Sequence, residues 1–272
     1  AISTARSTSQ VHALEHIELS GRDRGIENAP FSISPTCNVD YSTDRTRIFT
    51  FFVEGTGLTI KGLNITSGAH AIHLSGPASA TIVDNAITDS AGAIHLDKDS
   101  TGQIGGNTIT GNLGYGINIQ ENSYARVGST APTRGHLPNI IKNNEGPGMT
   151  VTQGLVPEIG NDISDNAGHG IQVDRSSTAE IYDTEISANA GDGNNVANGS
   201  GATFDPINNE APQIKGNTAN IPNRDYGLSC STGGHIAGER DTLNGLKSAE
   251  RIDGGCVSDR RTAQQSSFGL SS

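Results

Sequence analysis

The sequence predicts an all-β chain wound into a parallel solenoid of about eight stacked coils, with capping segments at both ends. Similar blocks begin 22, 23, 32, 22 and 23 residues apart, at Ala71, Ala93, Gly116, Gly148, Gly170 and Gly193. A period near 22 residues is typical of a repeat architecture. Each block opens with an apolar–polar–apolar triplet, the alternation of a strand that buries one face. Asparagine recurs at the corners, where stacked amides can hydrogen-bond from coil to coil.

Residues 1–57 are expected to form an N-terminal cap with entry strands. Residues 10–19 are a short amphipathic stretch that ends in the strand-like Ile17-Glu18-Leu19, and residues 47–53 are aromatic and β-branched. The end of a solenoid exposes unpaired strand edges, so a capping segment is expected there.

Residues 58–255 are expected to form the solenoid, with three short strands in each coil. The second strand of a coil is anchored by Ile82, Ile104, Ile159 or Ile181, and the third by Ile87, Ile109, Ile163 or Ile186. Corner asparagines separate them, namely Asn85, Asn107, Asn161 and Asn217, and a further set precedes the next block, namely Asn112, Asn166 and Asn189. Each coil adds one strand to each wall, at a spacing of about 4.8 Å.

Extra chain and the C-terminal end interrupt this pattern. The surplus of the coil that begins at Gly116 is assigned to residues 131–139, and a second insertion falls within residues 193–226. Insertions in a solenoid map to loops. Residues 239–251 are expected to form a short polar cap, and residues 256–272 a polar tail.

Composition and charge exclude several classes of partner. The net charge is −11, so no basic stripe can neutralise the phosphates of a nucleic acid. No apolar run of about 18 residues occurs, so membrane insertion is not expected. Cys230 and Cys256 lie about one coil apart and could pair, which would leave Cys37 odd, although the sequence leaves the pairing open. Together with sequons at Asn64 and Asn198, this favours an extracellular or cell-surface location.

Period-2 alternation also tells which first-strand side chains point outward. One column consists of His73, His95, Asn118, Thr150, Gln172, Asn195 and Ser229, and its neighbour contains Asp97, Gln120 and Asp174. The corner column before the strand contains His70, Tyr115 and His169. Stacking therefore predicts one outward patch across three coils, made of His70, His73, His95, Asp97, Tyr115, Asn118 and Gln120, with Lys98 at its edge.

The Gly-Ile-x-Val strand, as in Gly170 to Val173, the Asn-x-Ile-Thr/Ser segment and the 22-residue period resemble the right-handed parallel β-helix repeat family, the pectin-lyase-like superfold. The resemblance covers about two-thirds of the chain and implies the right-handed parallel β-helix fold. The family includes polysaccharide lyases, epimerases and hydrolases as well as adhesins and tailspikes, so it implies a polysaccharide partner without fixing a reaction. Its enzymes hold substrate lengthwise along an outward sheet face.

On that face, the predicted patch has the groups for acid–base chemistry on an acidic glycan. His73, His95, Asp97 and Tyr115 are the candidate catalytic residues, with a histidine and a tyrosine on opposite sides of a uronate C5–H. Candidate substrate-binding residues along the face are His70, Lys98, Asn118, Gln120, Gln172, Asp174 and Arg175. Asp97 could orient His95 or hold Ca²⁺ against the substrate carboxylate. Two stacked histidines could also hold a transition metal, but the sequence shows no third and fourth ligand at suitable spacing, so the metal remains unknown. Any outward face is polar, so ordinary filling of that face is the competing interpretation.

A hydrolase motif is the second candidate site. Gly168-His169-Gly170 resembles the Gly-His-Gly signature of polygalacturonase-type glycoside hydrolases, but the paired aspartates that supply acid and base there are missing, and only Asp162 and Asp165 lie nearby. The motif lies at a corner of the coil, and the same corner carries other residues in the other coils. A structural role at that corner therefore explains the motif better than a catalytic one.

Three functions therefore stay open. The leading hypothesis is an extracellular β-helix protein that binds or processes a polysaccharide, lyase-like or epimerase-like on a uronate polymer if catalytic. The first alternative is a non-catalytic structural or adhesive module, and the second a hydrolase of polygalacturonase type. The oligomeric state is left open.

Overall fold

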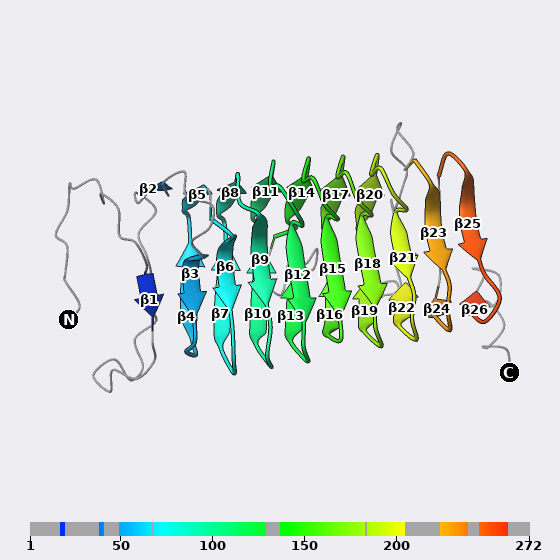
Figure 1. The fold of residues 1–272 in the computed structure, drawn as a ribbon, viewed down its shortest axis with the longest axis horizontal. Coiled ribbons are helices and arrows are strands. Elements are labelled where there is room, and N and C mark those ends of the chain that lie inside the picture. The colour runs from blue at the N-terminus through cyan, green and yellow to red at the C-terminus, as the bar shows by residue number, and fades with distance from the viewer. Residues whose placement is uncertain are drawn as a thin grey trace, which may run out of the picture.

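The structure is a computed structural model, and it describes residues 17–19, 38–40, 49–66, 68–128, 137–182, 184–204, 224–238 and 245–260. Within these ranges the regular elements are strands, and they stack coil upon coil into three parallel sheets along one axis (Figure 1). In the same part of the chain, no helix has the length and apolar character needed to cross a membrane.

The first sheet forms the wall on which the predicted patch lies. Its strands, in hydrogen-bonded order, are β1 (Ile17–Leu19), β3 (Phe49–Val53), β6 (His70–Leu74), β9 (Gly92–Leu96), β12 (Ile117–Gln120), β15 (Met149–Thr152), β18 (Ile171–Asp174), β21 (Asn194–Val196), β23 (Tyr226–Cys230) and β25 (Ser248–Ile252).

The second and third sheets close the coils. The second sheet consists of β26 (Val257–Arg260), β24 (His235–Gly238), β22 (Gly201–Phe204), β19 (Thr178–Ile181), β16 (Leu155–Ile159), β13 (Tyr124–Val127), β10 (Thr101–Gly105), β7 (Ser79–Val83) and β4 (Leu58–Lys61). The third sheet consists of β2 (Asn38–Asp40), β5 (Asn64–Thr66), β8 (Ala86–Thr88), β11 (Thr108–Thr110), β14 (Ile140–Lys142), β17 (Asp162–Ser164) and β20 (Glu185–Ser187).

Strict alternation fixes which side chains form the core. Ile72 and Leu74 of β6 are fully buried, and they pair with Ile94 and Leu96 of β9 in the next coil. Each such side chain contributes about 1.5–3 kcal/mol by leaving water. A slip of one residue would turn the whole set outward, so burial fixes the register. The same register places His73 beside His95 on the opposite, outward face.

Two asparagine ladders hold the corners, as the sequence predicted. In the first, Asn85, Asn107, Asn139 and Asn161 bond side chain to side chain at 2.9, 2.9 and 2.7 Å. In the second, Asn112, Asn144, Asn166 and Asn189 do so at 2.8, 2.9 and 3.0 Å. All eight side chains are buried. A buried amide without a hydrogen-bond partner would cost about 1–3 kcal/mol, and the ladder provides that partner. Asn217 lies outside the described residues.

A third ladder, of serines, supports the turn that leads from the first to the second sheet. Ser123 Oγ accepts a hydrogen bond from the backbone of Ser100 at 3.2 Å, and Ser200 Oγ accepts one from Ser177 at 3.2 Å. Just before the first of these serines, Lys98 and Asp99 adopt positive φ angles of 53° and 65°. Their left-handed conformation turns the chain sharply after Asp97 and so fixes the position of the Asp97 backbone.

The C-terminal end differs from the sequence-based expectation. Within the stretch expected to form a polar cap, Ser248–Ile252 is strand β25 and pairs with β23. Within the stretch expected to form a polar tail, Val257–Arg260 is strand β26 and pairs with β24. Cys230 and Cys256 form a disulfide, with their Cα atoms 5.9 Å apart, which links two neighbouring coils.

Candidate functional site

The predicted patch forms on the first sheet where the sequence placed it. His73 of β6, His95 of β9 and Asn118 of β12 occupy the same position on three consecutive coils. Further along the face, the same column continues through Thr150 and Gln172. The alternation of the strands therefore predicted the stacking correctly.

The patch is far more buried than an outward face suggests. His73 and His95 are each 7% exposed, Asp97 is 6% exposed and Asn118 is 9% exposed. Rings on neighbouring coils cover one another: the His70 ring stacks on His95 at a centroid distance of 4.6 Å, and Phe52 meets His73 edge-on at 5.2 Å. Coils stack at about 4.8 Å, which leaves little room for water between side chains of this size.

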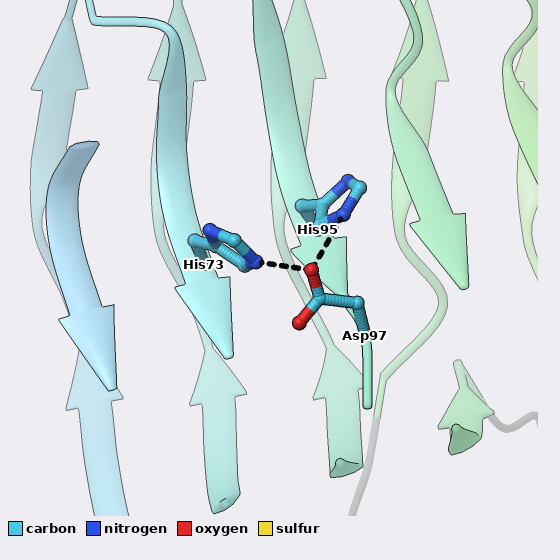
Figure 2. Close-up of side chains that lie close together, drawn as sticks. All are labelled: His73, His95 and Asp97. Carbon is cyan, nitrogen blue, oxygen red and sulfur yellow. Dashed lines mark ion pairs between the residues drawn. The ribbon is translucent and has the colours of Figure 1, made fainter. Parts of the chain in front are cut away.

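Asp97 joins the two central histidines. Its Oδ2 atom lies 3.0 Å from His73 Nε2 and 3.5 Å from His95 Nε2 (Figure 2). Burial alone would raise the pKa of Asp97, but the side chains of Ser75 and His73 and the nearby imidazole charges outweigh it, and the pKa falls below its usual value. Asp97 is thus an ionised carboxylate between two imidazoles.

The second nitrogen of His95 faces Tyr115. His95 Nδ1 lies 2.6 Å from Tyr115 Oη, which in turn lies 3.0 Å from His70 Nδ1. Asn118 Nδ2 also donates to His95 Nδ1, at 3.2 Å. We therefore assign the His95 proton to Nε2, facing Asp97, so that Nδ1 accepts from the hydroxyl of Tyr115. His95 and Tyr115 are in direct contact, so this pair does not lie on opposite sides of a sugar ring.

Burial sets the charge of these groups. It lowers the pKa of His95 to about 4, with a smaller contribution from His73, and it lowers the pKa of His70 to about 4, with a smaller contribution from His95. The pKa of His73 is also lowered, again mainly by burial. Burial raises the pKa of Tyr115 far above its usual value. At neutral pH the cluster therefore holds neutral imidazoles, a neutral tyrosine and one carboxylate.

Gly92 permits the contact between Tyr115 and the histidines, and the sequence analysis missed this role. A Cβ atom at Gly92 would lie 2.7 Å from the Tyr115 ring and 2.9 Å from His70 Nδ1, closer than real Cβ contacts. The signal was available, since Gly92 is the glycine of a corner column that elsewhere carries large side chains. Phe52 and Ser75 were not predicted either.

The remaining predicted residues divide into two groups. Gln120 accepts from Asn118 Nδ2 at 3.2 Å, and Lys98 Nζ lies 3.5 Å from Ser75 Oγ, so both residues border the patch. Gln172, Asp174 and Arg175 do not join it, because they belong to the coil of β18, three coils further on, or about 14 Å away. There the Asp174 carboxylate accepts hydrogen bonds from Asn198 Nδ2 at 2.6 Å and from the Arg175 backbone at 2.9 Å.

The Gly-His-Gly histidine lies in a second cluster on the same sheet. His169 Nδ1 accepts a hydrogen bond from the Asp192 backbone at 3.0 Å and lies 3.6 Å from the Asp192 carboxylate. That carboxylate also accepts from Ser229 Oγ at 2.5 Å and from the Tyr226 backbone at 3.1 Å. Asp162, by contrast, lies on β17 of the third sheet.

With the coil geometry established, comparison with known proteins bears on the family. Residues 37–159 match the sequence model of a family described as "Right handed beta helix region". The match covers less than half of the chain, and with the three parallel sheets it gives the chain the right-handed parallel β-helix fold. No curated protein matches this β-helix in sequence.

Two solved β-helix structures resemble the chain. One is a mutant of the periplasmic alginate epimerase AlgG, with a TM-score of 0.49 and 17% identity over 78% of this chain and 46% of that chain. The β-helix described here thus spans less than half of that protein. The other is the A-module of the mannuronan C-5 epimerase AlgE6 from Azotobacter vinelandii, with a TM-score of 0.31 and 13% identity over 78% of this chain and 76% of that chain.

Proposed function

We propose that this β-helix binds an acidic polysaccharide along its first sheet and cleaves it by β-elimination at Tyr115. The observation that carries the proposal is the continuous chain of polar contacts from Asp97 through His95 and Tyr115 to His70. A hydroxyl that donates to a neutral imidazole, itself oriented by a carboxylate, is the arrangement that activates a weak acid for proton transfer.

The direct contact between His95 and Tyr115 favours elimination over epimerisation. Epimerisation needs a proton removed from one side of C5 and returned from the other, but the two side chains are 2.6 Å apart and leave no space for a sugar between them. Acting in series, they serve one side of the ring. Tyr115, which is only partly buried, is the member that meets the substrate.

The proton balance of this step is closed within the cluster. Tyr115 takes the C5 proton as its own hydroxyl proton passes to His95 Nδ1, and Asp97 stabilises the imidazolium that forms. The electron pair of the broken C5–H bond forms a C4=C5 double bond while the C4–O bond breaks. The departing oxygen takes the proton back through Tyr115, which leaves His95 neutral again.

The surroundings support an acidic substrate outside the cytoplasm. Lys98 stands exposed beside the patch, where it can meet a uronate carboxylate. The disulfide between Cys230 and Cys256 is typical of an oxidising compartment, so we place the protein outside the cell or on its surface.

Incubation of the full chain with a panel of uronate polymers tests this function. We expect unsaturated ends to appear with one polymer and to fall at least about 100-fold in Tyr115→Phe, the range of general acid–base catalysis. Tyr124→Phe, on the second sheet, is the matched control and should keep full activity. Inversion of configuration at C5 without cleavage would show epimerisation and overturn the elimination step.

The burial of the cluster favours one alternative, a non-catalytic surface module. Side chains that are 6–7% exposed can serve mainly to fill the outward face. This alternative predicts binding of a polymer without any change in the polymer, and Tyr115→Phe would then leave binding unaltered.

A further inference from the structure

We propose that His73, His95 and Asp97 form a binding site for one divalent transition-metal ion of the Zn²⁺ class. The three side chains come from two consecutive coils of the first sheet and converge on one point (Figure 2). The inference concerns binding alone; a bound ion reverses the hydrogen bond between His95 and Tyr115, so the elimination step proposed above belongs to the metal-free protein.

The geometry fits a small ion. One donor atom from each residue lies within 4.8 Å of the others, and Asp97 Oδ2 is 3.0 and 3.5 Å from the two Nε2 atoms. Ligands about 2.0–2.1 Å from Zn²⁺ at tetrahedral angles are about 3.3 Å apart. Two of the three distances therefore match, and the third, between the donor atoms of the two histidines, is at most 4.8 Å.

The donors are also in a suitable chemical state. An imidazole binds a metal only when it is neutral and a carboxylate only when it is ionised, and the ordinary pKa values of histidine and aspartate provide both forms above about pH 7. Asp97 Oδ1 is buried and makes no hydrogen bond of normal geometry among the described residues, although the Ser75 side chain is near enough to lower the pKa of this carboxylate. A buried carboxylate oxygen without a partner is costly, and a cation beside it removes that cost.

The outer contacts of His95 are compatible with a bound ion. With Nε2 on the metal, the His95 proton moves to Nδ1 and is donated to Tyr115 Oη, which donates in turn to His70 Nδ1. These two contacts persist with their direction reversed, while Asn118 Nδ2 gives up its hydrogen bond to His95 Nδ1 and keeps the one to Gln120. A second nitrogen that donates to a fixed acceptor is the usual support of a metal-binding histidine.

The donor set argues for a transition metal rather than Ca²⁺. Two imidazoles and one carboxylate suit Zn²⁺, Co²⁺ or Ni²⁺, whereas Ca²⁺ takes about six to eight oxygen ligands. Three protein ligands leave a fourth position for water or another oxygen donor. The sequence alone does not indicate this third ligand, because Asp97 lies in the neighbouring column and only the folded chain turns its carboxylate toward both histidines.

The second cluster provides the matched control. His169 also lies beside a buried aspartate on the same face, but its Nδ1 already accepts a backbone N–H, and the Asp192 carboxylate accepts hydrogen bonds from Ser229, Asn195 and the Tyr226 backbone. A histidine beside an aspartate is therefore present in both clusters, while the converging second histidine is found in the first.

The test is titration of the untagged, chelator-treated full chain with Zn²⁺ by calorimetry and with Co²⁺ by visible absorption. We expect one ion per chain, with affinity reduced at least about 100-fold in Asp97→Asn and in His73→Gln, beyond the range of outer contacts. His169→Gln should bind as the unsubstituted protein does. Far-ultraviolet circular dichroism verifies folding, and if Asp97→Asn fails to fold, His73→Gln decides.

Three results would overturn the site: no saturable binding by the unsubstituted protein, binding that survives in His73→Gln, or equal loss in His169→Gln. Because no polymer is present, a failure here is separate from a failure of the elimination activity. Activity in the presence of a chelator, measured in parallel, tests the proposed function alone.

Discussion

The first sheet carries two clusters of histidine and aspartate whose chemistry differs. In the first, Asp97 faces His73 and His95 across two coils, and one carboxylate oxygen makes no hydrogen bond of normal geometry among the described residues. In the second, Asp192 faces His169, and its carboxylate accepts hydrogen bonds from a hydroxyl, an amide and a backbone N–H.

The difference shows how one β-helix face can carry both a reactive and a structural cluster. The carboxylate of Asp192 accepts hydrogen bonds from its neighbours, so its oxygens are not available to a metal ion or a substrate. The first aspartate is held ionised by its neighbours and keeps bonding capacity on one carboxylate oxygen, which an ion or a substrate can use. Identical residue types therefore do not predict identical roles, and the satisfaction of each polar atom separates them.

The largest expected effect is on stability and falls on the second cluster. Asp192→Ala should lower the free energy of unfolding by about 2–4 kcal/mol, because it leaves buried donors without their charged acceptor. Asp97→Ala, in metal-free protein, should cost only about 1 kcal/mol, because His95 can move its proton to Nδ1 and donate it to Tyr115, so that His73 Nε2 is the one imidazole nitrogen that loses its carboxylate partner. Equilibrium unfolding in urea measures both, and equal losses would contradict the distinction between the clusters.

Much of the fold could be predicted from the sequence. Alternation gave the inward and outward columns, and the spacing of Asn85, Asn107 and Asn161 gave a corner ladder that the structure confirms. Asn139 belongs to the same ladder, although we assigned it to an insertion from the sequence. The sequence does not show at which residue the chain returns to the regular coil after the insertion.

The site was predicted only as a set of columns. The outward column predicts that His73 and His95 stack. It does not predict that Asp97 is shielded from water by these rings, which lie on coils about 4.8 Å apart. Nor can it tell that the absence of a side chain at Gly92 lets Tyr115 reach His70 and His95. These features depend on side-chain rotation and on contacts two coils apart, which periodicity does not encode.

The next effect is a dependence of stability on pH that comes from the first cluster. His70 and His95 have folded pKa values of about 4 against an ordinary value of 6.5, so the unfolded chain binds more protons between these pH values. The free energy of unfolding should therefore be constant above about pH 6.5 and fall as the pH drops toward about 4. Asp97, whose pKa lies below its usual value, adds a further loss only at lower pH.

The double variant His70→Gln/His95→Gln should flatten this part of the profile. Urea unfolding of metal-free protein at several pH values between about 4 and 7 provides the measurement. A slope that persists in the double variant would mean that other groups produce it, and that the histidines of the first cluster titrate alike in the folded and unfolded chain.

The smallest expected effect falls on the stretch between the clusters and asks whether one polymer spans it. Gln172 lies in the same column as His95, about 14 Å away, and the Arg175 side chain is 69% exposed. A chain that lies lengthwise on the sheet would meet these residues without placing its reacting sugar near them. Gln172→Ala/Arg175→Ala should therefore raise KM by about 2- to 5-fold and leave kcat unchanged, the signature of lost uniform binding. A fall in kcat would place the chemistry nearer to the second cluster, and an unchanged KM would show that the polymer crosses the sheet instead of following it.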